Sequence, residues 1–229
     1  MRASTIPLLL SLALAGTHAH AQSYNQISFN VETAKTIAND ELTATLTKSA
    51  DNANAKTLAN TLNTTANKAL AIAQKYPNVK VTTGRHHTYP RYDNKGKING
   101  FTGSSSINIQ SQNFEEASEL IAELQGFMTL GSLDFGVSEA TQKAVENELK
   151  AQTIQKFTDE AKTISTAFGA SDYRIIKVDL NNAGGRFSVS PVMGYAVAEA
   201  KDSSATIQSY EGGESRLNYE AQGVIELVK

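Results

Sequence analysis

The chain of 229 residues contains no cysteine. Without thiols it can form no disulfide, no thiolate metal site and no cysteine nucleophile, and it cannot carry the acylated cysteine of a lipoprotein anchor. The sequence also has no run of basic residues. Its 21 Lys and Arg are outnumbered by 23 Asp and Glu, for a net charge of −2. Nucleic acid recognition needs clustered cations, so the composition argues against a nucleic acid partner.

Long hydrophobic runs are also scarce, and the clearest one, from Ile6 to Ala15, lies close to the N-terminus. About ten apolar residues fall short of the roughly 20 that cross a bilayer. The run follows a basic start and leads to Ala19-His20-Ala21, which is typical of a secretory signal peptide, although an uncleaved anchor is the alternative. We therefore expect residues 1–21 to be removed on export. The remaining residues 22–229 would form a single periplasmic domain without a transmembrane segment.

Common catalytic signatures are absent too. The sequence has no G-x-S-x-G elbow, no H-E-x-x-H zinc motif, no phosphate-binding loop and no S-x-x-K pair, and each of these motifs encodes a geometry that its chemistry needs. After export only His86 and His87 would remain as histidines. A Ser-His-Asp triad would have to use one of them as its base, and no serine context favours it. We expect no enzymatic activity and no cofactor.

Hydrophobic spacing predicts an α+β fold with the element order β-β-α-β-β-α-β-α-β-β. Consecutive hairpins require antiparallel pairing, so we expect a mostly antiparallel sheet with helices covering one face. In the first half the patterns predict an opening β-hairpin from strands at about 27–31 and 42–46, a helix at about 51–76 ended by Pro77, a second hairpin from strands at about 79–81 and 101–109, and a helix at about 114–124 capped by Asn113.

The second half predicts a strand at about 133–137 and then a long helix from Glu139 to Phe168, capped by Ser138. A helix of this length measures about 45 Å and must cross a wide or elongated sheet; a heptad coiled coil is the alternative. Strands follow at about 176–180 and 217–227, and the last is expected to be buried. Between them, the residues from about 181 to 215 are rich in Gly, Ser and Ala and predict a long flexible excursion, an assembly arm or a weak hairpin.

One stretch, RHHTYPRYD at residues 85–93, gathers two histidines, two tyrosines and a carboxylate. Adjacent side chains on a strand point to opposite faces, so His86 and His87 cannot chelate one ion while the strand stays regular. A small-molecule or metal site centred on residues 86–93 is nevertheless the alternative to a structural turn. We name His86, His87, Tyr89, Tyr92 and Asp93 as a candidate interaction surface, with no metal ligand or catalytic residue assigned.

The order of motifs resembles the SIMPL-domain family of secreted bacterial proteins, which includes the periplasmic immunogenic proteins. The resemblance is carried by TYPRYDNKGKINGFTGSSSINIQS, by GSLDFGVSEATQKAVENELKAQTIQKFTDEAKTISTAFGA, by Pro191-Val192-Met193 and by the closing GVIELVK. The first helix is richer in Asn and Thr than the family pattern, and the loop after Gly185 differs freely.

The resemblance implies an α+β domain in the periplasm or cell envelope, a tendency to self-assemble, no established enzymatic activity and, for some members, a link to oxidative-stress tolerance. It supplies no catalytic residue. The leading hypothesis is therefore a non-enzymatic exported protein that acts through homo-oligomerisation or contact with an envelope protein.

Overall fold

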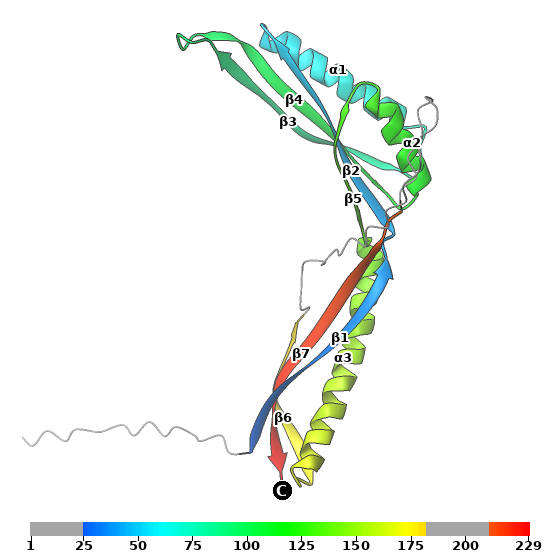
Figure 1. Ribbon diagram of the computed structural model, residues 1–229, viewed down its shortest axis with the longest axis vertical. Helices are drawn as coiled ribbons and strands as arrows, with labels where there is room; N and C mark the ends of the chain where they lie inside the picture. Colours follow the sequence, from blue (N-terminus) through cyan, green and yellow to red (C-terminus); the bar gives the residue numbers. More distant parts are fainter. Residues whose placement is uncertain (1–24, 182–210) are drawn as a thin grey trace, which may run out of the picture.

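The computed structural model describes residues 25–181 and 211–229 (Figure 1). The predicted signal peptide and nearly all of the predicted excursion lie outside the described residues. The elements, in chain order, are β1 Gln26–Ala38, β2 Glu41–Asn52, α1 Ala55–Ala73, β3 Lys80–Tyr92, β4 Ile98–Ser111, α2 Phe114–Gln125, β5 Thr129–Gly136, α3 Glu139–Ala167, β6 Asp172–Asn181 and β7 Glu214–Val228. This α+β order, with antiparallel strands, confirms the predicted fold class.

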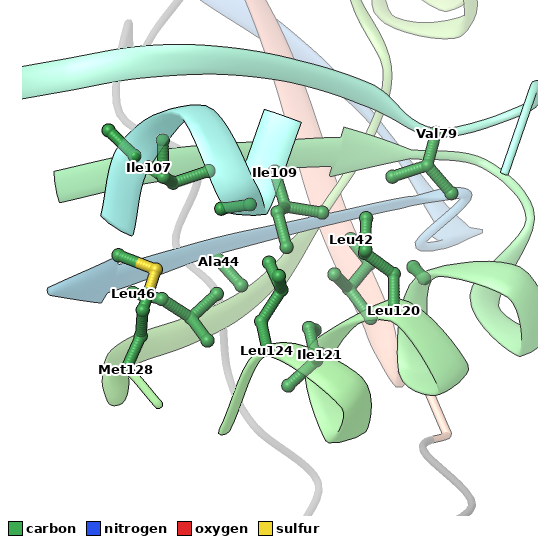
Figure 2. Packing of buried hydrophobic residues seen from close by; sticks show 13 residues of the cluster. Leu42, Ala44, Leu46, Val79, Ile107, Ile109, Leu120, Ile121, Leu124 and Met128 are labelled. Atoms are coloured by element: carbon green, nitrogen blue, oxygen red, sulfur yellow. The ribbon is translucent and has the colours of Figure 1, made fainter. Parts of the chain in front are cut away.

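The larger sheet has the strand order β3-β4-β2-β5, and every neighbouring pair is antiparallel. Helices α1 and α2 cover one of its faces. Figure 2 shows the resulting core, in which buried side chains of β2 and β4 meet those of α2; its labelled members are Leu42, Ala44, Leu46, Val79, Ile107, Ile109, Leu120, Ile121, Leu124 and Met128. The opposite face of this sheet carries mainly Thr, Ser, Asn and Gln side chains. The alternation of apolar and polar residues along each strand explains both faces.

The smaller sheet has the order β1-β7-β6 and is also antiparallel. Helix α3 runs along one face, as Figure 1 shows, so the long helix covers an elongated sheet as predicted. Phe157 of α3 is 2% exposed, and its ring stacks on Phe29 with 4.5 Å between the ring centroids. Ala161, Val31, Ala221 and Ile225 complete this second core.

The predicted opening hairpin is wrong. β1 pairs with β7, whereas β2 pairs with β4 and β5, so two consecutive strands belong to different sheets. Their connection, Asn39-Asp40, makes no turn: the Asn39 N–H donates to the carbonyl of Gly213 and the Asp40 N–H to that of Gly136, each at 3.0 Å. Because each residue is bound to a different neighbour, the chain passes straight from one sheet into the next.

The helix boundaries differ by a few residues from the predicted ones. α1 begins at Ala55 rather than near residue 51 because β2 continues to Asn52 and the side chain of Asn54 caps the helix. Asn113 and Ser138 cap α2 and α3 as predicted, each accepting a hydrogen bond from a first-turn N–H. The closing strand is the central strand of its sheet, which confirms that the chain end is buried in a sheet.

Candidate functional site

The candidate interaction surface lies on the β3–β4 hairpin, whose closed end forms one extremity of the molecule (Figure 1). Pairing runs from Lys80 opposite Gln110 to Tyr92 opposite Ile98, with irregularities between Thr83 and His86 and beside Tyr92. β3 is an edge strand, so its outer side has no strand partner within the sheet. The structure therefore puts all five named residues on one projecting ribbon, though on different faces of it.

The two histidines lie opposite neighbouring residues of β4, His86 facing Ser105 and His87 facing Ser104. The pairing register shifts just before His86. Successive side chains of a regular strand point to opposite faces, and the separation of the two imidazoles stays a prediction. The Nε2 atom of His87 lies 3.2 Å from the hydroxyl of Ser104, and its ring lies 5.1 Å from that of Tyr89. Among the described residues no group of three His, Asp or Glu side chains could hold a metal ion. A metal or small-molecule site here stays a prediction.

The remaining three residues have different roles. Tyr89 and Tyr92 are 59% and 61% exposed, which is high for aromatic side chains. Asp93 instead forms the turn, since its Oδ1 accepts the N–H groups of Lys95 at 2.8 Å and Lys97 at 2.9 Å. Gly96 in this turn has φ +74, a conformation that favours glycine. Asp93 shapes the tip, and the tyrosines are presented by it.

A second group of exposed apolar side chains lies at the other extremity, where α3 turns into β6. Phe168 is 69% exposed, and Ile175 and Ile176 are 45% and 48% exposed. Val228 joins them, because it pairs with Asp172 at the start of β6. We call Phe168, Ile175, Ile176 and Val228 the far-end patch. Sequence reasoning missed it, because an apolar residue in a strand or at a helix end is expected to be buried unless the tertiary structure leaves it uncovered.

Sequence reasoning also missed a polar joint between the two sheets. Asn39 is 7% exposed; its side-chain nitrogen donates to the carbonyl of Gly212 at 2.6 Å and its oxygen accepts from the hydroxyl of Ser215 at 2.6 Å. Asp40 accepts from the backbone N–H of Ser138 at 2.6 Å and from the hydroxyl of Thr141 at 2.7 Å. The Asn-Asp pair between two alternating runs was the available signal, and its usual meaning is a turn.

The electrostatics of this joint centre on Asp40. Partial burial raises the pKa of its carboxyl group, but hydrogen bonds from the Ser138 backbone and from the Thr141 and Ser138 hydroxyls stabilise the charged form more strongly. Its pKa is therefore lowered from the ordinary value of 3.8. The carboxylate is an anchor for the start of α3 rather than a proton donor.

A cleft of about 920 Å³ opens beside the joint. It is lined by the beginnings of α2 and α3 and by the ends of β2, β3 and β4, with amide side chains and charges of both signs that include Glu41, Lys80, Gln110, Gln112, Glu139 and Lys143. None of the five residues predicted from sequence lines it. The structure thus separates this cleft from the five candidate residues.

None of the helices in the described ranges combines the length and the hydropathy of a membrane span. A search of curated proteins finds no match to the chain. A family model, SIMPL, described as a protein of unknown function (DUF541), matches residues 27–225 and so extends over both sheets. By this match, which takes in almost the whole chain, the protein belongs to the SIMPL family.

Proposed function

We propose that this protein is exported to the periplasm, has no enzymatic activity and acts through protein contacts, first of all with further copies of itself. Export is supported by the signal-peptide pattern of residues 1–21. The resemblance extends the proposal to a role in the envelope or in oxidative-stress tolerance, tested by the peroxide survival of a deletion strain.

The far-end patch is the observation that carries self-assembly. Exposed large apolar side chains at one end of a molecule are candidates for an interaction site. Phe168, Ile175, Ile176 and Val228 lie there at the end of α3, on β6 and on β7. The same end also offers β6, an edge strand. The register of β6 shifts between Ile175 and Lys177, so this edge strand is not regular along its length. An irregular edge pairs poorly with another strand, which favours contact through side chains over the addition of a strand.

Size-exclusion chromatography with light scattering on residues 22–229 tests the proposal. We expect a mass above that of one copy at micromolar concentration. Ile176→Lys should weaken association tenfold or more, because burial of one such side chain stabilises a contact by about 1.5–3 kcal/mol. Ile154→Lys is the matched control, since Ile154 is 42% exposed on α3, away from the patch. A strict monomer in the wild-type protein would exclude self-assembly.

A further inference from the structure

The tip of the β3–β4 hairpin carries three large side chains that no element within residues 25–181 and 211–229 covers. Tyr92 pairs with Ile98 across the ribbon, and Tyr89 lies three residues further from the turn. Ile98 is 56% exposed, so the tip adds an aliphatic side chain to the two exposed tyrosines. Tyrosine carries an apolar ring with a polar end, a combination suited to a boundary between water and an apolar phase.

These side chains occupy both faces of the ribbon. Tyr89 and Tyr92 are three positions apart on β3, an odd offset, and the extra residue of the register shift beside Tyr92 lies on β4. Their rings therefore point to opposite faces. A partner lying flat on one face would cover only one of them, whereas contact made end-on, by the tip itself, covers both.

The same tip is positively charged. Residues 89–98 hold three cations, Arg91, Lys95 and Lys97, and one carboxylate, Asp93, for a net charge of +2, although the whole chain carries −2. Arg91 also lies 3.5 Å from Asp51 of β2, an exposed pair that screens part of one charge. Lys95 and Lys97, at the turn, have no such carboxylate partner within the described residues. The charge of the tip is complementary to an anionic surface.

The turn is held in shape before any contact. Besides the two bonds to its carboxylate, the Asp93 N–H donates to the carbonyl of Lys97 at 2.8 Å and the Gly96 N–H donates to the carbonyl of Asp93 at 3.0 Å. A turn fixed by its own hydrogen bonds loses little conformational freedom on binding. The lysines and the Tyr92–Ile98 pair are thus presented together.

We propose that this tip, residues 89–98, docks end-on onto a bilayer that contains anionic phospholipids, at the depth of the headgroups. Lys95 and Lys97 would contact lipid phosphates, and the rings of Tyr89 and Tyr92 with Ile98 would enter the interfacial layer, where aromatic side chains are preferred. The charges at the turn keep the contact shallow, because a lysine in the hydrocarbon core is costly.

This inference goes beyond the proposed function and does not depend on it. The tip and the far-end patch lie at opposite extremities of the elongated molecule (Figure 1). One end can therefore contact lipid while the other contacts a second copy.

A tryptophan reporter gives the first test, because the chain has no tryptophan. Residues 22–229 are used, since the apolar run before them would itself bind lipid. In Tyr92→Trp we expect a blue shift of the emission with vesicles of phosphatidylcholine and phosphatidylglycerol, and no shift with phosphatidylcholine alone. Ile154→Trp, on the exposed side of α3, is the control and should not shift. No shift in Tyr92→Trp with anionic vesicles would overturn the proposal.

Co-sedimentation with the same vesicles tests the charges. Lys95→Gln with Lys97→Gln should weaken binding roughly 25-fold, since each cation near an anionic surface contributes about fivefold. Lys150→Gln with Lys162→Gln removes the same charge from α3 and should leave binding within about twofold. Equal losses in the two double variants would show a nonspecific charge effect and overturn the proposal.

The lipid-free mass of Tyr89→Ser with Tyr92→Ser separates a membrane contact from a protein contact. We expect its oligomeric state to match the wild type while vesicle binding falls at least tenfold. A change to monomer without lipid would make the tip a contact between copies and overturn the proposal. Repeating vesicle binding with Ile176→Lys shows whether lipid docking survives when self-assembly fails.

Discussion

At the scale of single residues, Asp40 connects segments of the chain that lie far apart in the sequence. Its carboxylate accepts a hydrogen bond from the backbone N–H of Ser138. It also accepts from the Ser138 hydroxyl at 2.8 Å, from the Thr141 hydroxyl at 2.7 Å and from the side-chain amide of Gln112 at 3.0 Å. An Asp side chain ahead of a helix also interacts favourably with the helix dipole. One carboxylate thereby joins β2 to the start of α3.

We predict that Asp40→Ala lowers the free energy of unfolding by about 1–3 kcal/mol at pH 7, because the Ser138 N–H loses its partner. The folded-state pKa of Asp40 is lowered, so its contribution is fully present above the ordinary value of 3.8 and is lost as the pH falls through the folded-state pKa. Urea unfolding at pH 7 and near pH 3 should show the difference between wild type and variant shrinking in acid. Asp134→Ala, at an exposed carboxylate of β5, is the control; an equal loss there would contradict the assignment.

At the scale of elements, the packing of α3 against β7 depends on one glycine, Gly223. A Cβ atom at Gly223 would lie 2.6 Å from the Lys177 carbonyl oxygen and 2.6 Å from Cζ of Phe157. Phe157 fills the space above the strand because nothing projects from Gly223. The close approach of helix and sheet requires the missing side chain.

Gly223→Ala should therefore destabilise the protein by about 1–3 kcal/mol, since both the ring and the β6 backbone must shift. Gly136→Ala is the matched control, because a Cβ there meets nothing within 4 Å; its effect should stay within about 1 kcal/mol. Thermal unfolding followed by circular dichroism measures both. Similar losses in the two variants would mean that β propensity, rather than the contact with Phe157, decides the outcome.

Periodicity was sufficient to predict the elements but not their partners. The alternation in β1 and β2 identified two strands correctly. It indicates which side chains are buried, but it does not indicate which other strand each strand pairs with. A two-residue gap such as Asn39-Asp40 normally makes a hairpin, and only contacts with residues about 100 and 170 positions further on hold it straight. At the hairpin, the turn-forming role of Asp93 needed coordinates, because it rests on hydrogen bonds from the N–H groups of Lys95 and Lys97.

At the scale of the whole molecule, the two sheets differ in how far apart their strands lie in the sequence. All four strands of the larger sheet and both of its helices lie within residues 41–136. The smaller sheet combines β1 from one end of the chain with β6 and β7 from the other. Local contacts form faster than distant ones, so the larger sheet should form first.

We predict that residues 40–138 fold alone into a cooperative α+β unit. Removal of residues 214–229 from the longer chain should leave that unit intact and should unfold α3, because its sheet loses the central strand. Amide hydrogen exchange distinguishes the two regions: protection in β2 and β4 should persist while protection in α3 disappears. Protected amides in α3 after the truncation would contradict this division.

Under the proposed export, the pairing of Gln26 with Glu226 would decide when the smaller sheet can form. A chain that crosses a membrane N-terminus first delivers β1 among its earliest residues and β7 among its last. The smaller sheet then has no central strand until the transporter has released almost the entire chain. Under that proposal, the smaller sheet would be completed only when translocation ends, and until then α3 would lack the sheet on which it packs.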